Sequence, residues 1–433
     1  MYSKLLALSQ CCRSRTAPPH HRSATMTMLT NLNIEQTRAH FPALQSGHIF
    51  ADNAGGSQIP KDVVDRISDY LLNTNVQINV DYSISIQSTQ RVAEGRASAA
   101  QLFNAAKPEQ VILGGSSTAN MENLLRQFDG DVNAGDEFIL MDGEHEANNG
   151  TWKKLAARTG AIIKYWHPVI TSTDNPLSVA HRLEHLIPLI TSKTRVVAFS
   201  ACSNILGSVV PVKEISQAVR AEAKVKGAQK VDISIDAVAY APHRKIDVQD
   251  WDIDFCMLSF YKMYGPHAAA LYVRSPVHQS SSSVAHELVY GSTGILPYLL
   301  SLTTENDLQS SFDAITSHEH TLVEPLLAFF THPEQRARGL MIVGSEEADA
   351  NRVPTISFVV QGRNPIPSQE IVKSINRKGG VGIRGYKYTC TTEDGIQLSL
   401  DGGVARISLV HYNTTEEVHK IIAILKEILY TSQ

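Results

Sequence analysis

Short apolar runs that alternate with longer helical patterns constrain the fold of this chain more than any other feature. Between two of the runs, apolar residues recur at helical spacing from Val212 to Ala223, and Lys226-Gly227 ends that helix. Strand and helix in alternation predict βαβ units on a largely parallel sheet, whose ligands bind beyond the carboxyl ends of the strands. The strand-sized runs are 111–113, 138–141, 162–166, 196–199, 231–235, 255–258 and 268–273.

After about residue 300 the pattern changes to that of a second, smaller unit. A helical stretch contains 302–327, strands are expected at 355–360 and 405–410, and a helix around 370–377 ends at Gly379-Gly380. A last helix begins at Thr414-Thr415-Glu416-Glu417, which matches a capping box. The chain of 433 residues is roughly three times the common single-domain length, so a smaller α+β domain after the α/β domain is expected.

Composition and charge exclude several functional classes. Hydrophobic residues make up 43% of the chain, which excludes wholesale disorder. Lys and Arg number 39 against 43 Asp and Glu, so neither a nucleic acid nor an anionic membrane is expected as a partner. No run of about 18 apolar residues is present, and five cysteines without a CxxC pair are not a disulfide framework. We therefore expect a soluble, intracellular enzyme.

Residues 1–28 differ in composition from the rest of the chain. Lys4, Arg13, Arg15 and Arg22 stand among Ser, Thr and His residues, and the first acidic residue is Glu35. A basic leader without acidic residues is typical of a mitochondrial transit peptide. A disordered tail, or translation that starts at a later methionine, explains the same composition equally well. The expected localisation is therefore mitochondrial or cytoplasmic.

Small polar residues follow the first strand-sized run. The string Gly114-Gly115-Ser116-Ser117-Thr118 stands directly before an apolar helical stretch. Backbone N–H groups and hydroxyls at a helix N-terminus form a cradle for phosphate. Gly and Ser also mark ordinary turns, so this loop alone leaves both interpretations open.

Two ionisable residues stand at strand ends, in surroundings where charge is costly. Asp236 follows the run 231–235, and a helix cap or an Asx turn is the common structural role for an acid in that position. Lys262 lies among aromatic and apolar residues just past the run 255–258. Desolvation there would lower the pKa of its amine, as a Schiff-base lysine requires.

One cofactor requires these groups together. Pyridoxal phosphate (PLP) needs a lysine for a Schiff base, an acid that keeps its pyridine nitrogen protonated, a group stacked on its ring and a phosphate cradle. Lys262, Asp236 and the loop at Ser116 and Ser117 supply three of these. The sequence therefore indicates a PLP site.

The order of Asn204, Asp236 and Lys262 resembles that of the class V aminotransferase family of fold-type I PLP enzymes. Within that family, the sequence motifs of the chain are most similar to those of the cysteine desulfurase and selenocysteine lyase-like branch. The matching strings, from about 50 to 414, are Ala51-Asp52-Asn53-Ala54-Gly55-Gly56, Glu144-His145-Glu146-Ala147-Asn148, Ser203-Asn204-Ile205-Leu206-Gly207, Asp236-Ala237-Val238, Ser259-Phe260-Tyr261-Lys262-Met263-Tyr264-Gly265-Pro266, and Arg406 through Tyr412-Asn413-Thr414.

The resemblance implies a domain organisation. The large PLP-binding domain, 51–295, would hold a mainly parallel seven-stranded sheet, and 296–433 would form the small α+β domain. Residues 29–50 would pack on the small domain, after the leader 1–28. Such enzymes form homodimers, so a second copy of this chain is the expected partner, and a free amino acid is the expected substrate.

The resemblance also implies roles around the cofactor. Lys262 would form the Schiff base and move protons, and His145, otherwise a common capping residue, would stack on the ring. Asp236 would pair with the pyridinium nitrogen, and Asn204 would donate a hydrogen bond to the phenolic oxygen.

The remaining implied roles concern phosphate and substrate. Ser116, Ser117 and Ser259 would hold the phosphate, and Ser292 would reach in from a neighbouring subunit. Arg406 would bind the substrate carboxylate through a bidentate fork, with Arg384 as a second substrate-binding residue.

Three departures from the desulfurase pattern put the reaction in doubt. Ala239 stands where desulfurases place a Gln or His, and Tyr261 replaces the His before the lysine. Ungapped counting from Arg384 puts Thr389 at the place of the sulfur-accepting cysteine, with Cys390 one residue beyond. Cys390 is therefore a candidate sulfur acceptor, and a buried structural cysteine is the alternative.

Several functions remain compatible with these residues. The first is a PLP enzyme that cleaves the C–S bond of an amino acid through Schiff-base and carbanion chemistry. An aminotransferase, a β-eliminating lyase or an epimerase on the same fold is the runner-up. A non-catalytic subunit that keeps the fold is the third. No metal is expected.

Overall fold

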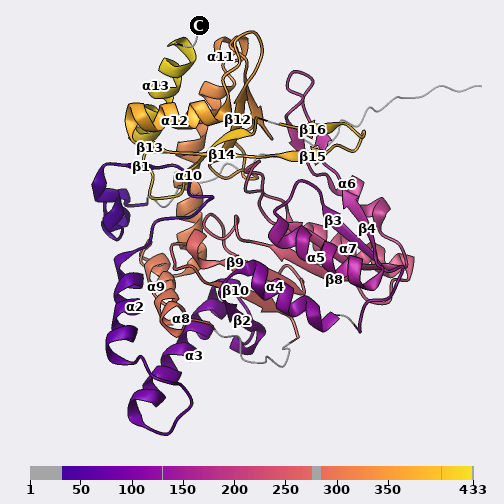
Figure 1. Ribbon diagram of the computed structural model, residues 1–433, viewed down its shortest axis with the longest axis vertical. Coiled ribbons are helices and arrows are strands. Elements are labelled where there is room, and N and C mark those ends of the chain that lie inside the picture. Colours follow the sequence, from indigo (N-terminus) through magenta and orange to yellow (C-terminus); the bar gives the residue numbers. More distant parts are fainter. Residues whose placement is uncertain (1–31, 129, 276–283, 401, 432–433) are drawn as a thin grey trace, which may run out of the picture.

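A seven-stranded mixed sheet forms the centre of the larger part of the molecule (Figure 1). The computed structural model describes residues 32–128, 130–275, 284–400 and 402–431. Strand β10 runs antiparallel to both neighbours, and the other neighbouring strands are parallel. The order is β2 (Val111–Gly114), β10 (Ala269–Val273), β9 (Phe255–Ser259), β8 (Asp232–Asp236), β7 (Thr194–Ser200), β3 (Glu137–Met141) and β4 (Ile162–Trp166). All seven strand-sized runs are strands of this sheet, which confirms the predicted α/β fold class.

Alternating residues of the central strands point to opposite faces of the sheet. Phe138 and Leu140 of β3 pack in one apolar cluster, whereas Ile139 and Met141 pack in another. Both faces are covered because the strands are apolar throughout, as parallel strands are. The helices in this part are α2 (Lys61–Asn73), α3 (Ser83–Phe103), α4 (Ser117–Leu125), α5 (Glu146–Thr159), α6 (Leu183–Leu186), α7 (Val212–Lys226), α8 (His286–Ser292) and α9 (Ile295–Leu300).

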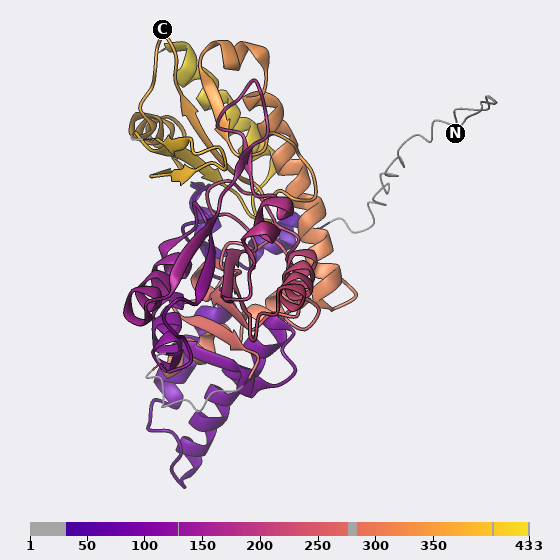
Figure 2. The same cartoon turned by 90° about the vertical axis from the view of Figure 1, so that its right-hand side faces the viewer.

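A four-stranded antiparallel sheet carries the smaller part of the molecule, above the first sheet along the long axis (Figures 1 and 2). Its order is β11 (Leu340–Val343), β12 (Thr355–Val360), β17 (Val404–Ser408) and β14 (Arg384–Tyr386). It packs with α10 (Leu308–Phe330), α12 (Ser368–Gly379) and α13 (Thr415–Thr431) around one apolar core. The predicted α+β character of this part is confirmed.

One predicted helix begins later than expected. The stretch that contained 302–327 is a short turn followed by α10, which starts after Asp307. The Asp307 side chain accepts a hydrogen bond from the backbone N–H of Ser310 at 2.9 Å, and this cap sets the start of the helix. A short α11 (Pro333–Ala337) follows it.

The segment after residue 31 joins the two parts. Strand β1 (Ile49–Phe50) pairs in parallel with β13 (Val381–Gly382), whereas Phe41 packs against Tyr264 and Tyr298 in the core of the larger part. Short elements complete the description: α1 (Ile34–Ala39), β5 (Val169–Ile170), β6 (Val179–Ala180), β15 (Thr389–Thr391), β16 (Gln397–Ser399) and five 3-10 turns, η1 (Pro42–Ser46), η2 (Pro108–Gln110), η3 (Arg126–Phe128), η4 (Ile187–Leu189) and η5 (Phe260–Lys262).

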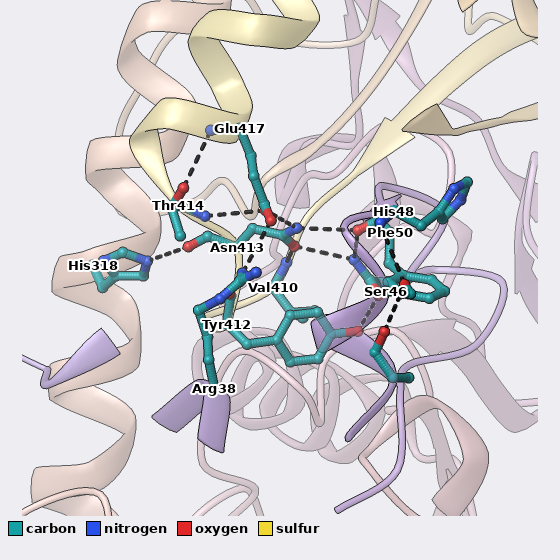
Figure 3. A network of polar contacts seen from close by, with 12 residues as sticks. Arg38, Ser46, His48, Phe50, His318, Val410, Tyr412, Asn413, Thr414 and Glu417 are labelled. Carbon is teal, nitrogen blue, oxygen red and sulfur yellow. Dashed lines mark hydrogen bonds and ion pairs between the residues drawn. The ribbon is translucent and has the colours of Figure 1, made fainter. Parts of the chain in front are cut away.

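A polar network fixes one turn of the small part against this segment (Figure 3). Arg38 donates to the carbonyl of Tyr412 at 2.6 Å and pairs with Glu417 at 3.0 Å. The Asn413 amide donates to the carbonyl of Phe50 at 3.1 Å and to Glu417 at 2.8 Å. The turn 410–414 is therefore held from both sides.

The leader 1–28 and the first part of the predicted segment 29–50 lie outside the described residues, and the mitochondrial or cytoplasmic localisation stays a prediction. The domain boundaries at 51 and 296 also stay predictions. Within the described ranges, no helix is both long enough and apolar enough to cross a membrane.

Candidate active site

A pocket lies where the carboxyl ends of β7, β8 and β9 meet the N-terminus of α4. About 520 Å³ of atom-free space extends to its open mouth. This is the position that a largely parallel sheet predicts for a ligand site. The pocket is lined by Ser116, Ser117, Thr118, His145, Ala147, Ser200, Cys202, Asn204, Asp236, Val238, Ala239, Ser259, Tyr261 and Lys262. Seven residues singled out from the sequence thus meet in one pocket.

Lys262 lies at the end of η5, directly after β9, and is 7% exposed. Burial lowers the pKa of its amine to about 8, although the carboxylate of Asp236 acts in the opposite direction. A larger fraction of this amine is neutral at physiological pH than of an ordinary lysine. Lys262 therefore combines a pocket-facing position with a nucleophilic amine, as the sequence predicted.

Asp236 ends the fully buried strand β8. One carboxyl oxygen accepts a hydrogen bond from the N–H of Val238 at 2.9 Å, which is the local turn that the sequence left open as an alternative. Burial raises the pKa of this carboxyl, while the hydrogen bond from Val238 and the positive charge of Lys262 lower it. A cationic ring nitrogen in the pocket would stabilise the charged form of this acid.

The residues predicted to form a phosphate cradle come from two loops. Ser116 caps α4 by accepting a hydrogen bond from Ala119 N–H at 3.1 Å, and Ser117 opens the helix. The hydroxyl of Ser117 lies 2.7 Å from that of Ser259, at the end of β9. Hydroxyls and backbone N–H groups at the N-terminus of a nine-residue helix are suited to an anion.

His145 caps α5 at the wall of the pocket. Its Nδ1 accepts a hydrogen bond from Ala147 N–H at 3.1 Å, so Nε2 carries the hydrogen of the neutral ring. Burial is the largest cause that lowers the pKa of His145, which favours that neutral form. A neutral imidazole held by its own helix is suited to stacking on a flat ligand.

Arg406 is 1% exposed and already has partners. One terminal nitrogen donates to the carbonyl of Asn204 at 3.0 Å, and the other donates to Asp52 at 2.8 Å. Arg384 lies on the opposite side of the same carboxylate, at 3.9 Å. Neither arginine lines the pocket, so the predicted bidentate contact with a substrate requires one of these pairings to change.

Comparisons with known proteins agree with this geometry. The model of the Aminotransferase class-V family matches residues 49–421. The chain belongs to the aminotransferase class-V family. An aminotransferase-like protein, FGM3, of Gibberella zeae is 37% identical over 92% of this chain and 99% of that protein. A cysteine desulfurase-like protein, ustD, of Aspergillus flavus is 28% identical over 92% of this chain and 91% of that protein.

A solved structure shows the same fold. The apo cysteine desulfurase of Thermococcus onnurineus superposes with a TM-score of 0.73 at 19% identity, over 93% of this chain and 99% of that one. A cysteine desulfurase of Escherichia coli gives 0.70 at 21% identity, with 93% and 100% covered. The class-V fold is therefore the fold-type I arrangement that the sequence implied, and the chain is an enzyme of this PLP-dependent family.

The residues present fit the cofactor of the class-V family. The pocket offers a buried amine, a buried carboxyl, a helix-capping imidazole and a hydroxyl pair at a helix N-terminus. Asn204 lines the same wall. Each chemical group that PLP requires thus has a matching side chain in one pocket.

Two departures from the desulfurase pattern also line the pocket. Ala239 has only a methyl group at the position where desulfurases place a Gln or His. The ring of Tyr261 stacks on that of His267, with 5.1 Å between the ring centroids. Burial raises the pKa of Tyr261, so its hydroxyl is neutral. This class-V chain therefore lacks both of the desulfurase side chains at these positions.

Cys390 is not in the pocket. It lies in β15 and is 4% exposed, and burial raises the pKa of its thiol. A thiol that is buried and protonated is a poor nucleophile. The geometry thus agrees with the structural interpretation of Cys390.

Ser292 is also outside the pocket of its own chain. It is 2% exposed at the end of α8, and its hydroxyl donates to the carbonyl of Val289 at 2.7 Å. Its proposed reach across a subunit interface concerns a second copy and stays a prediction.

A second, more polar chamber opens beside the pocket and shares His145 and Asn204 with it. It contains about 810 Å³ of atom-free space up to its mouth. It is lined by Asp142, Gly143, Glu144, His145, Glu146, Asn149, Lys153, Asn204, Ile205, Tyr386, Lys387, Tyr388 and Thr389. Most of the side chains that line this chamber are polar.

Three residues of the site were missed at the sequence level. Asp52 stands in a matching string, but its pairing with Arg406 joins positions 354 residues apart. Burial and two neighbouring carboxylates raise the pKa of Glu144 well above its usual range. Burial raises the pKa of the Tyr388 hydroxyl well above its usual range. All three features depend on packing between segments that are distant in the sequence, so no local sequence pattern predicts them.

Proposed function

We propose that this chain binds PLP through Lys262 and uses it to act on a free amino acid. The observation that carries the proposal is the buried Lys262 amine, with a lowered pKa, in one pocket with Asp236, His145 and the paired hydroxyls of Ser117 and Ser259. When bound, PLP supplies an electron sink that stabilises negative charge at the substrate Cα.

The side chains of the pocket have different roles toward the cofactor and the substrate. Asp236 would stabilise a protonated ring nitrogen, because a buried carboxylate and an adjacent cation stabilise each other. His145 would stack on the ring, and the hydroxyls at Ser117 and Ser259 would hold the phosphate. The Lys262 amine is placed in the same pocket, where it would take a proton from the substrate Cα and return it. The burial of Asp236 and Lys262 strengthens their electrostatic contacts.

Two outcomes of this chemistry are proposed, and different observations favour them. Sequence similarity to cysteine desulfurases favours removal of sulfur from cysteine. The buried thiol of Cys390, the absence of a hydrogen-bonding side chain at Ala239 and the large polar chamber favour another outcome. That outcome is transamination, elimination or epimerisation of an amino acid with a longer, polar side chain.

Incubation of the holoenzyme with cysteine distinguishes these outcomes through product identification. Sulfide and alanine support desulfuration, pyruvate with ammonia supports β-elimination, and turnover that requires an oxo-acid supports transamination. A panel of polar amino acids, scored by the change in cofactor absorbance on binding, tests the chamber. Protein that takes up no PLP under any condition would contradict the proposal and favour a non-catalytic subunit.

We also propose a homodimer, as the family suggests. Seven large hydrophobic side chains that are exposed lie between residues 64 and 86, on α2, the following loop and the start of α3. They are Val64, Leu71, Leu72, Val80, Tyr82, Ile84 and Ile86. This helical hairpin projects from the end of the molecule opposite the small sheet (Figure 1). Several exposed, large apolar side chains on one hairpin are typical of an interface.

A further inference from the structure

Tyr264 lies two residues after Lys262 in a backbone conformation that a large side chain rarely adopts. Its φ angle is +64°, in the left-handed region, and its side chain is fully buried. Strain of this kind persists where surrounding contacts determine it, and it is frequent at functional sites. The contacts that hold Tyr264 therefore also hold the turn that carries Lys262.

The backbone around Lys262 is tied to a second segment. The N–H of Tyr264 donates to the hydroxyl of Ser57 at 2.8 Å, and the N–H of Ser57 donates to the carbonyl of Tyr261 at 3.0 Å. One serine thus fixes the peptide group that precedes Lys262 and the peptide group between Met263 and Tyr264. The tyrosine side chain completes the attachment on the other side.

The hydrogen bonds of the Tyr264 side chain have a determined direction. Its hydroxyl has a single hydrogen and lies 2.9 Å from the carbonyl of Pro242, which only accepts. The same oxygen, 3.0 Å from Nδ1 of His411, must therefore accept from that nitrogen. A neutral imidazole then offers Nε2 as an acceptor, to which the hydroxyl of Tyr298 donates.

The protonation state of His411 agrees with this series of hydrogen bonds, which runs from Tyr298 through His411 and Tyr264 to Pro242. His411 is fully buried, and burial lowers its pKa well below the usual range. A second proton on the ring would leave the Tyr298 hydroxyl without its acceptor. The neutral ring with hydrogen on Nδ1 satisfies every group in the chain.

His411 itself is held in place by the small part of the molecule. It lies in the turn 410–414, where Val410 N–H donates to Asn413 at 3.0 Å and His318 donates to the Asn413 carbonyl at 2.8 Å (Figure 3). Arg38 fixes the carbonyl of Tyr412 in the same turn. The turn that carries His411 is therefore fixed by several hydrogen bonds.

We propose that Tyr264 and His411 are positioning residues for Lys262. The relay from Tyr298 through His411 and Tyr264 to Pro242 couples the small part of the molecule to the turn that presents the amine. This inference rests on the proposed function, because it takes Lys262 as the residue that carries PLP.

The test compares Tyr264→Phe and Tyr298→Phe with Tyr70→Phe. Tyr70 is a matched control because it is 1% exposed and its hydroxyl bonds to Ser88 away from the pocket. For each protein the rate at which PLP links to Lys262 is followed by absorbance after addition to apoenzyme. The pH midpoint of the linked chromophore and the melting temperature are also measured.

We expect PLP capture to slow about ten- to a hundredfold in Tyr264→Phe and less in Tyr298→Phe, with a shifted chromophore midpoint in both. Tyr70→Phe should lower the melting temperature alone. Variants that differ from wild type only as Tyr70→Phe does would overturn the inference, as would an effect of Tyr264→Phe without one of Tyr298→Phe. If Tyr264→Phe does not fold, the PLP-capture rate and the chromophore midpoint of Tyr298→Phe test the inference. Wild-type protein that captures no PLP at Lys262 would instead contradict the proposed function.

Discussion

At the scale of single residues, the site depends on groups whose ionisation is set by burial. Lys262 and Asp236 each lose solvent at the end of a strand, and their opposite charges offset part of the cost. The amine and the carboxyl are therefore interdependent. A change of pH acts on the pocket first through Lys262.

The pH dependence of PLP capture follows from the lowered pKa of Lys262. The neutral amine is the nucleophile, so the capture rate by apoenzyme should rise about tenfold per pH unit below pH 8 and level off above it. Stopped-flow absorbance measures this rate, with N-acetyl-lysine as a reference that titrates near its usual value. A rate that continues to rise to pH 10 would show that Lys262 is an ordinary, solvated lysine.

At the scale of elements, the β15–β16 ribbon decides whether Cys390 is accessible. Asp142, just after β3, accepts from Thr391 N–H at 2.8 Å and from Nδ1 of His167 at 3.0 Å. Glu393 N–H donates to the carbonyl of Pro168 at 2.9 Å. The ribbon is thus fastened to the larger part of the molecule, with the Cys390 thiol beneath it.

Removal of the Asp142 charge should loosen this ribbon. Hydrogen bonds to a charged group contribute about 1.5–3 kcal/mol, so Asp142→Asn should raise the alkylation rate of Cys390 about tenfold. Peptide mass spectrometry after a timed iodoacetamide pulse measures the rate. Asp313→Asn, at an exposed site on α10, is the control. Rapid alkylation of Cys390 in the unaltered protein would instead support its role as a sulfur acceptor.

At the scale of the whole molecule, the α2–α3 hairpin lies at the end away from the small sheet (Figure 2), and it carries exposed apolar side chains. Leu72 is 82% exposed, and six other large hydrophobic side chains between residues 64 and 86 are exposed with it. The proposed dimer would bury this hairpin.

Light scattering tests this association. The protein should have twice the mass of one chain, and Leu71→Glu with Leu72→Glu should shift it toward the monomer, because two charges would be buried at the interface. Val225→Glu, at another exposed apolar position, should leave the mass unchanged. A monomeric wild-type protein that holds PLP tightly would exclude the dimer.

Much of the fold and the pocket could be predicted because the sequence patterns that specify them lie within short segments. Strand-sized runs located all seven strands of the large sheet, and loops at their ends located Ser117, Asp236 and Lys262. The Asp52–Arg406 pair and the Tyr264–His411 contact join positions 354 and 147 residues apart, and only packing brings them together. The burial of Cys390 likewise depends on the β15–β16 ribbon, which has no strong periodicity.

The most direct test of the central claim is reduction of the PLP-loaded protein with borohydride, followed by peptide mapping. Lys262 lies in a pocket whose side chains match the cofactor, so we predict one pyridoxyl group per chain, on the peptide that contains Lys262, and none in Lys262→Ala. Labelling of a different lysine, or equal labelling of Lys262→Ala, would contradict the assignment of this pocket as a PLP site.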